Sequence, residues 1–256
     1  MSTTDDQTSD GLSDWQSCNV LMERWLQVII RYFLTVYCTM NNLILESLCS
    51  LNHTAGRQDM WDQRYSERGY AYGTCPNDFL VEAAAFLQPQ AKILCLAEGE
   101  GRNAVYLATE GHHVVAVDTS AVGLAKAAKL ALERGVVIET IIADLSSYLI
   151  EPLSFDAIIS IFCHLPPPAQ ARIHAQIYQG LRPGGGIFIL EGYSKNQQHY
   201  TSGGPKNSAL LMNLKTIKAE LSPLVLKHAV EIERHIHEGA YHNGRGSVVQ
   251  IIAEKM

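Results

Sequence analysis

The sequence is poor in charge, and no part of it is strongly basic. Only 18% of its 256 residues are charged, with 20 Lys and Arg against 26 Asp and Glu and a formal net charge of −6. A protein that follows a phosphate backbone needs a basic stripe or patch, and the chain has no run of Lys or Arg long enough for one. We therefore expect no nucleic-acid partner.

Paired cysteines are also missing. The chain has six cysteines and no Cys-x-x-Cys pair; they are Cys18, Cys38, Cys49, Cys75, Cys95 and Cys163. Scattered cysteines of this kind indicate free thiols in a reducing compartment, so we expect a cytoplasmic protein. Cys95 lies in an apolar run, where a thiol acts as a small apolar filler.

The histidines near the C-terminus do not form a clear metal motif. His235 and His237 would share one face of a strand, as metal ligands can. The segment from Gly239 to Gly244, which contains His242, is typical of a hairpin loop, where exposed histidines are common. We expect no metal site.

Residues 1–59 have no uninterrupted apolar run of membrane-spanning length. Residues 1–14 are polar, which is typical of disorder, and residues 18–51 are apolar enough for a helix. Arg31 and Asn41-Asn42 interrupt the 20 or so apolar residues that a span would need, and the acidic start does not fit a secretory signal. A membrane-surface or partner-binding helix and a loosely packed extension both stay open.

The most informative segment is Ala91–Asp118. An apolar run, Ile93–Leu96, ends in a turn that contains Gly99 and Gly101. A helix-like stretch follows, and a second apolar run closes on Asp118. This order is the first half of a Rossmann-type nucleotide-binding unit, in which the glycines let the backbone pass under a ligand and the acid binds ribose hydroxyls.

Charge favours one cofactor over another at this turn. The segment Gly99–Ala104 fits the dinucleotide pattern G-x-G-x-x-G/A, but Glu98 and Glu100 stand there against Arg102 alone. A dinucleotide places its pyrophosphate on such a turn, where nearby carboxylates would repel it. S-adenosylmethionine (SAM) has no phosphate and presents an ammonium and a sulfonium instead. The acidic turn therefore favours SAM over NAD.

Two further apolar runs end in residues that could reach the same edge. Val136–Ile142 leads to Asp144, whose carboxylate could accept a hydrogen bond from an adenine amino group. Phe155–Ile161 leads to Phe162 and His164. A histidine at this place could remove a proton from a thiol or hydroxyl, or it could only shape the pocket.

The segment Leu181–Gly186 reads Leu-Arg-Pro-Gly-Gly-Gly and stands before the apolar run Ile187–Leu190. With this turn the sequence resembles the class I SAM-dependent methyltransferases over roughly Met60–Lys255. It is most similar to the small-molecule group that includes tellurite-resistance and thiol methyltransferases, because Trp61–Tyr65 and Tyr70–Gly73 look like the segment that covers their cofactor.

The glycine motif departs from that family at two positions. In this family, an acid usually stands two residues before the first glycine of the motif. Here Cys95 stands at the position of the acid, and Ala97 stands at the position of that glycine. Glu98 or Glu100 could bind the methionine ammonium instead. The residues that we expect to contact the cofactor are Trp61, Tyr72, Ala97, Glu98, Gly99, Glu100, Gly101, Asn103, Asp118, Thr119, Asp144, Leu145 and Phe162.

Helices and strands alternate from Asn77 onward, which predicts an α/β fold: a Rossmann-like, doubly wound, mostly parallel seven-stranded sheet with a C-terminal antiparallel hairpin. The expected helices are Asn77 to about Leu87, Arg102–Thr109, Ala121–Arg134, Pro168–Leu181 and Asn207–Leu221. The first strand of the sheet is expected at Lys92–Leu96. The C-terminal hairpin is expected to consist of Leu224–Ile236 and Gly246–Ala253. We predict an N-terminal extension, 1–59, and a methyltransferase domain, 60–256.

The expected function is methyl transfer from SAM to a small-molecule acceptor, such as a thiol or a chalcogen, by in-line displacement. His164 is the candidate catalytic base, although an easily ionised acceptor needs none. Two alternatives stay open, an NAD(P)-dependent oxidoreductase and a SAM-binding protein without catalysis. The sequence does not indicate the oligomeric state.

Overall fold

The structure of the protein is a computed structural model that describes residues 58–256. Nearly all of the predicted extension lies outside the described residues, so its predicted role and the domain boundary at Met60 stay predictions. Among residues 58–256, no helix is long and apolar enough to cross a membrane.

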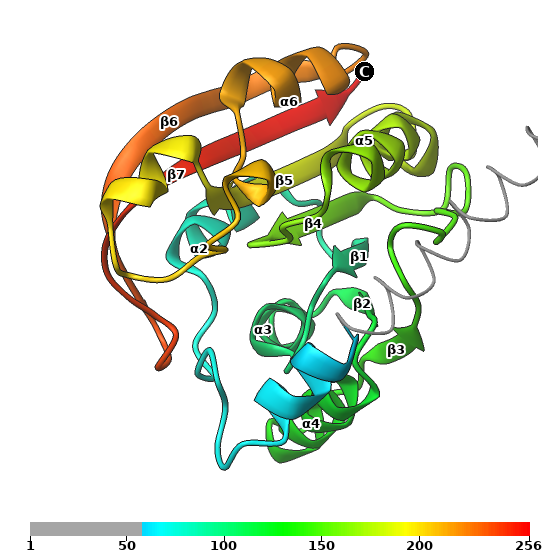
Figure 1. The fold of residues 1–256 in the computed structure, drawn as a ribbon. Coiled ribbons are helices and arrows are strands. Elements are labelled where there is room, and N and C mark those ends of the chain that lie inside the picture. The colour runs from blue at the N-terminus through cyan, green and yellow to red at the C-terminus, as the bar shows by residue number, and fades with distance from the viewer. Residues whose placement is uncertain (1–57) are drawn as a thin grey trace, which may run out of the picture. The chain divides into compact units, whose positions relative to one another are not determined.

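Seven strands form one sheet in the order β3-β2-β1-β4-β5-β7-β6 (Figure 1). The first five strands pair in parallel, and β7 runs antiparallel to both β5 and β6. The expected fold class is confirmed. The strands are β1 (Lys92–Leu96), β2 (His113–Asp118), β3 (Glu139–Ile142), β4 (Ala157–Ile161), β5 (Gly186–Tyr193), β6 (Val225–Glu238) and β7 (His242–Lys255).

The helices that connect these strands start and end close to their expected positions. A helix over residues 58–65 precedes the sheet. The α-helices are α2 (Asp78–Ala83), α3 (Arg102–Thr109), α4 (Ala121–Glu133), α5 (Pro167–Gly180) and α6 (Leu214–Glu220), and the 3-10 helices are η1 (Ala84–Phe86), η2 (Lys195–His199) and η3 (Ser208–Leu210).

Several expected elements are shorter than the sequence suggested, and two of them have a clear physical cause. The strand expected at Val136–Ile142 starts only at Glu139, because Val136 N–H closes the end of α4 by bonding Ala131 O at 3.0 Å. The helix expected at Asn207–Leu221 is divided into η3 and α6. Met212 interrupts it because its backbone pairs with the segment after β5 through an isolated bridge.

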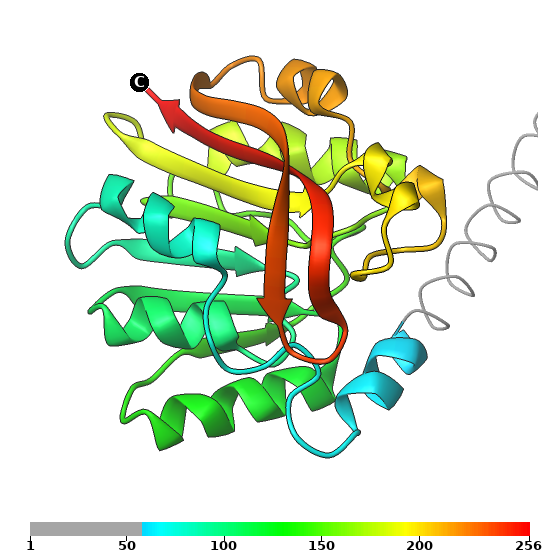
Figure 2. The ribbon, with the colours of Figure 1, turned by 90° about the vertical axis from the view of Figure 1, so that its left-hand side faces the viewer.

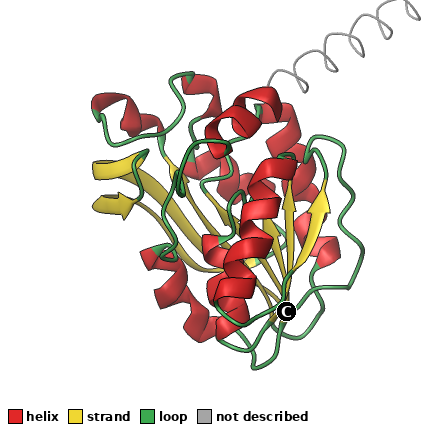
Figure 3. Cartoon of the chain, turned by 90° about the horizontal axis from the view of Figure 1, so that it is seen from below, coloured by secondary structure: helices red, strands yellow, loops and turns green. Residues whose placement is uncertain are grey.

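Successive residues of the central strands point to opposite faces of the sheet, as the pleat requires. In β1, Leu94 and Leu96 pack in one apolar core with α5 and α6, whereas Ile93 and Cys95 pack in the other with α2, α3 and α4. Figure 3 shows helices on both sides of the sheet. Because both faces are covered, the chemistry is restricted to the edges, and in a parallel sheet ligands bind beyond the carboxyl ends of the strands.

The long β6–β7 hairpin extends beyond the sheet and its turn reaches the segment that follows helix 58–65 (Figure 2). Ala240 N–H donates to Ala71 O at 3.0 Å, and Gly239 lies against the backbone of Tyr72 and Gly73. A Cβ on Gly239 would lie 2.4 Å from Ala71 O, so only glycine allows this contact. The hairpin therefore holds the N-terminal part of the domain.

Candidate functional site

The turn after β1 uses left-handed backbone at three positions. Gly99 and Gly101 have φ of +61° and +90°, and the non-glycine Ala97 has φ of +52°. Gly101 N-caps α3, and a Cβ there would lie 2.5 Å from the Ala127 side chain of α4. A strained non-glycine residue beside such a turn is a common feature of ligand sites.

Asp118 ends β2 beside this turn. Its two carboxylate oxygens accept hydrogen bonds from Gly99 N–H at 2.9 Å and Ser120 N–H at 2.8 Å. Burial raises the pKa of Asp118 to about 6, and only 6% of the residue is exposed. Each carboxylate oxygen can accept a further hydrogen bond, so this acid can bind a pair of ribose hydroxyls.

Glu98 turns back over the start of α3. Its Oε1 accepts hydrogen bonds from Asn103 N–H at 3.0 Å and Ala104 N–H at 2.7 Å. Burial raises the pKa of Glu98 to about 7, while burial and the nearby Glu98 raise the pKa of the Cys95 thiol well above its ordinary value. The carboxylate thus lies beside Cys95, where the sequence lacks an acid, and it takes the N–H groups that a pyrophosphate would need.

Glu100 has a different environment. Its Oε2 accepts a hydrogen bond from Ala71 N–H at 2.7 Å, and its Oε1 pairs with Lys126 Nζ at 2.8 Å. Both oxygens are therefore used to hold the 66–76 segment and α4 to the glycine turn. Of the two expected ammonium ligands, Glu98 is the better placed.

Helix 58–65 covers the glycine turn with aromatic side chains. The buried Tyr65 side chain lies so close to Gly99 that a Cβ there would be 2.5 Å from its hydroxyl. Trp61 stacks on Tyr65 with ring centroids 5.5 Å apart, and Tyr72 lies 6.5 Å from Tyr65. Tyr65 was not among the expected site residues, although its spacing of four from Trp61 would have placed both on one helix face.

Asp62 lies on the same helix and ties it to β2. Its carboxylate accepts a hydrogen bond from Ser120 Oγ, and Ser120 N–H in turn bonds Asp118. The covering helix is therefore fixed directly to the residues around Asp118.

Phe162 lies at the end of β4 with φ of +50°, a second strained non-glycine residue at the same edge. Its ring contacts those of Tyr193 and His242 at centroid distances of 4.7 and 4.5 Å. The Tyr72 ring also lies 4.5 Å from the His242 ring. We call these four residues, Tyr72, Phe162, Tyr193 and His242, the ring cluster.

His164 has no nitrogen available for a substrate proton. Its Nδ1–H donates to Leu210 O at 2.9 Å, and its Nε2 accepts from Tyr193 N–H at 3.2 Å. Burial lowers the pKa of His164 to about 4. These contacts speak against the expected role as catalytic base, which stays a prediction, and in favour of the other expected role, in which the ring shapes the site by linking β5 to the η3 segment.

The other expected contact residues lie at the same edge but have structural contacts of their own. Asn103 Oδ1 accepts from Asn77 N–H at 2.9 Å, and Asp144 Oδ1 accepts from Ser146 N–H at 2.8 Å. Leu145 is buried in the core, and Thr119 follows Asp118 directly. Their cofactor contacts stay predictions.

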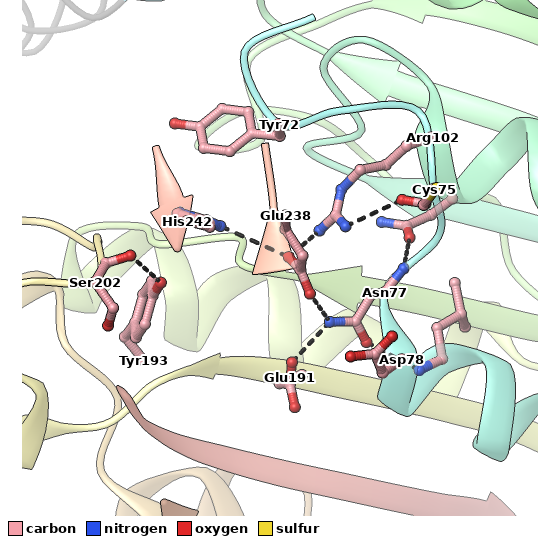
Figure 4. A network of polar contacts seen from close by, with 12 residues as sticks. Tyr72, Cys75, Asn77, Asp78, Arg102, Glu191, Tyr193, Ser202, Glu238 and His242 are labelled. Atoms are coloured by element: carbon pink, nitrogen blue, oxygen red, sulfur yellow. Dashed lines mark hydrogen bonds and ion pairs between the residues drawn. The ribbon is translucent and has the colours of Figure 1, made fainter. Parts of the chain in front are cut away.

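A buried network of charges lies beside Tyr72, Tyr193 and His242 (Figure 4). Glu238, at the end of β6, pairs with Arg102 of α3 and accepts a hydrogen bond from Asn77 Nδ2 at 2.7 Å. Arg234 bridges Glu238 and Glu191 of β5. This network could not be predicted from the sequence, because its members come from β6, β5, α3 and the N-cap of α2.

No group of three or more His, Cys, Asp or Glu residues that could hold a metal ion occurs between residues 58 and 256. His235 and His237 stack on each other with centroids 6.1 Å apart, and both are exposed.

Comparison with known proteins agrees with this geometry. The family described as "Methyltransferase domain" matches residues 93–185, which run from β1 to the turn before β5. Phosphoethanolamine N-methyltransferase 2 of Caenorhabditis elegans is 30% identical over 143 residues. That match covers 54% of this chain, and the chain spans only 33% of the length of the nematode protein.

Solved structures show the same fold. TehB from Haemophilus influenzae superposes with a TM-score of 0.59 at 19% identity, covering 70% of this chain and 62% of that one. A SAM-dependent methyltransferase from Methanosarcina mazei gives 0.53 at 19% identity, covering 68% and 97%. Residues 93–185 thus match a methyltransferase domain, and the strand order around them gives the chain the fold of a solved SAM-dependent methyltransferase.

Proposed function

We propose that this protein transfers a methyl group from SAM to a small-molecule acceptor, and that the carboxyl edge of β1, β2 and β4 holds both reactants. The observation that carries the proposal is the pair of carboxylates flanking the turn after β1. Asp118 is fixed by Gly99 and Ser120 for ribose hydroxyls, and Glu98 lies beside Cys95 for the methionine ammonium. The Asp118 carboxylate can accept hydrogen bonds from the ribose hydroxyls of SAM, and the Glu98 carboxylate has the charge opposite to that of its ammonium.

SAM supplies an activated methyl group when it is bound. The protein then has to hold the acceptor in line with that methyl group and keep water out. Trp61 and Tyr65 cover the glycine turn and exclude water from it. Phe162 and Tyr193 face the acceptor side with apolar rings. Alignment of nucleophile and methyl carbon, together with exclusion of water, supplies most of the rate enhancement that such a displacement needs.

The acceptor class that fits this edge is a thiol or a related chalcogen. The ring cluster offers aromatic faces, which favour sulfur over strongly hydrated groups. It belongs to elements far apart in the chain, since Tyr72 precedes β1 and His242 starts β7. Amines are the second class to test, because the nematode relative is named a phosphoethanolamine N-methyltransferase.

Dinucleotide chemistry is disfavoured by the contacts of Glu98. A pyrophosphate would have to displace this carboxylate from the N–H groups of Asn103 and Ala104. Binding of SAM without catalysis is the other alternative, and turnover distinguishes it.

The test is incubation of the protein with methyl-labelled SAM and a panel of aliphatic thiols, selenide, amines and phenols. Label in the thiol or selenide fraction supports the proposal. Label only in amines overturns the acceptor class, and full binding of SAM without transfer to any member overturns catalysis on small acceptors.

A further inference from the structure

Two histidines lie near the acceptor side of the site, and their environments differ. Both nitrogens of His164 bond to backbone groups, as described above. His242 is 8% exposed, and its Nδ1 is buried without a hydrogen-bond partner in the described part of the chain. A buried, unpaired nitrogen costs free energy, so its retention calls for a functional explanation.

His242 stands inside the ring cluster rather than behind it. Its ring centroid lies 4.5 Å from Tyr72, 4.5 Å from Phe162 and 5.1 Å from Tyr193. These contacts come from residues 58–76, which we call the covering segment, from the end of β4 and from β5. The imidazole therefore lies where the covering segment meets the acceptor side of the site.

Glu238 faces His242 across the hairpin turn. Its Oε2 lies 3.7 Å from His242 Nδ1, as Figure 4 shows, which is too long for a hydrogen bond but within ion-pair distance. Burial works to raise the pKa of Glu238, but His242, Arg102 and Arg234 together lower it to about 2. The carboxylate is therefore ionised at neutral pH and can stabilise an imidazolium.

We propose that His242, oriented by Glu238, accepts the proton of the acceptor nucleophile during methyl transfer. The inference rests on the proposed function. With Nδ1 toward Glu238, Nε2 carries the lone pair. A thiol S–H passes its proton to Nε2, its sulfur bonds the methyl carbon of SAM, and the methyl–sulfonium bond breaks. The products are a methyl thioether, S-adenosylhomocysteine and an imidazolium that later releases its proton to water.

The charges around His242 suit this role. Glu238 of β6 is the anion that faces it, and Arg102 of α3 and Arg64 of helix 58–65 are the cations. His164 and Tyr193 are the neighbouring titratable groups from the β4 and β5 ends. Burial, opposed by Glu238, lowers the pKa of His242 below its ordinary value, so the ring is neutral and able to accept a proton near pH 7.

The test compares two thiols in the His242→Gln variant at saturating SAM. 2-Mercaptoethanol is protonated at neutral pH and needs a base, whereas 4-nitrothiophenol is already ionised. We expect kcat with 2-mercaptoethanol to fall about 100-fold and kcat with 4-nitrothiophenol to change by less than about threefold. The affinity for S-adenosylhomocysteine should not change. His235→Gln, an exposed histidine on β6, is the matched control and should leave both rates intact.

Equal losses with both thiols would mean that His242 only packs, and no loss with either would remove it from the mechanism. Failure of the wild-type protein to methylate either thiol would instead overturn the proposed acceptor class. If the His242→Gln variant does not melt cooperatively, the pH dependence of kcat in the wild-type protein is the test instead. kcat with 2-mercaptoethanol should fall below an apparent pKa that is lower than 6.5, and a profile without that acidic limb would contradict the proposal.

Discussion

The carboxylate of Glu98 accepts a hydrogen bond from Ala104 N–H at 2.7 Å, so the N-terminus of α3 already holds an anion. A helix N-terminus normally attracts the phosphates of a nucleotide. Here an internal acid, Glu98, takes that place. In the proposed site, the carboxylate that disfavours a pyrophosphate is also the negative charge for the ligand ammonium.

The affinity for S-adenosylhomocysteine should depend on pH through Glu98. The pKa of this acid in the free protein is about 7, and the ligand ammonium prefers the ionised form. Below pH 7 binding must release a proton, so the affinity should rise by up to about tenfold per unit between pH 5.5 and 7. Calorimetry across this range measures the slope.

Glu98→Gln should weaken binding and flatten that slope, whereas Glu100→Gln should keep the slope because its oxygens bond Ala71 and Lys126. An unchanged slope in Glu98→Gln would show that another group holds the ammonium.

Glu98 should also make the ligand-free protein less stable at high pH. Its pKa is raised on folding, so the folded state binds the proton more tightly and stability falls as pH increases from about 4.5 to 7. At pH 8 the Glu98→Gln variant should unfold with a free energy about 1–2 kcal/mol higher than the wild type. Urea melts at pH 5 and pH 8 test this, and a wild type that is equally stable at both would contradict it.

Loss of Asp118 should weaken cofactor binding strongly. Asp118→Ala removes two charge-assisted hydrogen bonds to the ribose, each worth about 1.5–3 kcal/mol before compensation by water, so we expect about a 100-fold loss of affinity. Asp156→Ala is the matched control, because Asp156 also accepts from a backbone N–H, that of Lys92, but at the opposite end of β1. Calorimetry showing equal affinities in the two variants would remove Asp118 from the site.

The contact between hairpin and covering segment should depend on Gly239. Gly239→Ala places a Cβ 2.4 Å from Ala71 O, whereas Gly111→Ala has the same type of backbone, with φ of +90°, and nothing within 4 Å. Both variants carry backbone strain, but only the first should separate the hairpin turn from the covering segment. We expect Gly239→Ala to lower S-adenosylhomocysteine affinity more than Gly111→Ala does. Equal affinities would show that the contact does not support the site.

A chain that begins at Met60 should retain cofactor binding. Every residue proposed here to contact SAM lies at Trp61 or later, and the sheet begins at Lys92. The shortened protein should melt cooperatively and bind S-adenosylhomocysteine with native affinity. Loss of folding would show that residues before Met60 belong to the core.

The glycine turn and the sheet could be predicted because their signals are local. Lys92–Leu96 and Arg102–Thr109 begin and end where the apolar runs and Gly101 indicated. Strands that are buried on both faces read as continuous apolar runs. The order of helices and strands then restricts the topology strongly.

The ring cluster could not be predicted, because its contacts join residues far apart in sequence. Tyr72 and His242 are 170 positions apart and meet only when the hairpin bends over the covering segment. His164 was expected to be reactive, since nothing in the sequence shows that Leu210 and Tyr193 bond its nitrogens. A pattern of residue types predicts which strand ends meet, but not which polar atoms are already paired.

The most direct test of the account is a crystal structure of the protein with S-adenosylhomocysteine. We expect the ribose hydroxyls to lie on Asp118, the ammonium to lie within hydrogen-bond distance of Glu98, and the ligand sulfur to face the ring cluster beside Phe162 and His242. A ligand whose ribose lies away from Asp118, or whose sulfur faces away from the ring cluster, would contradict it.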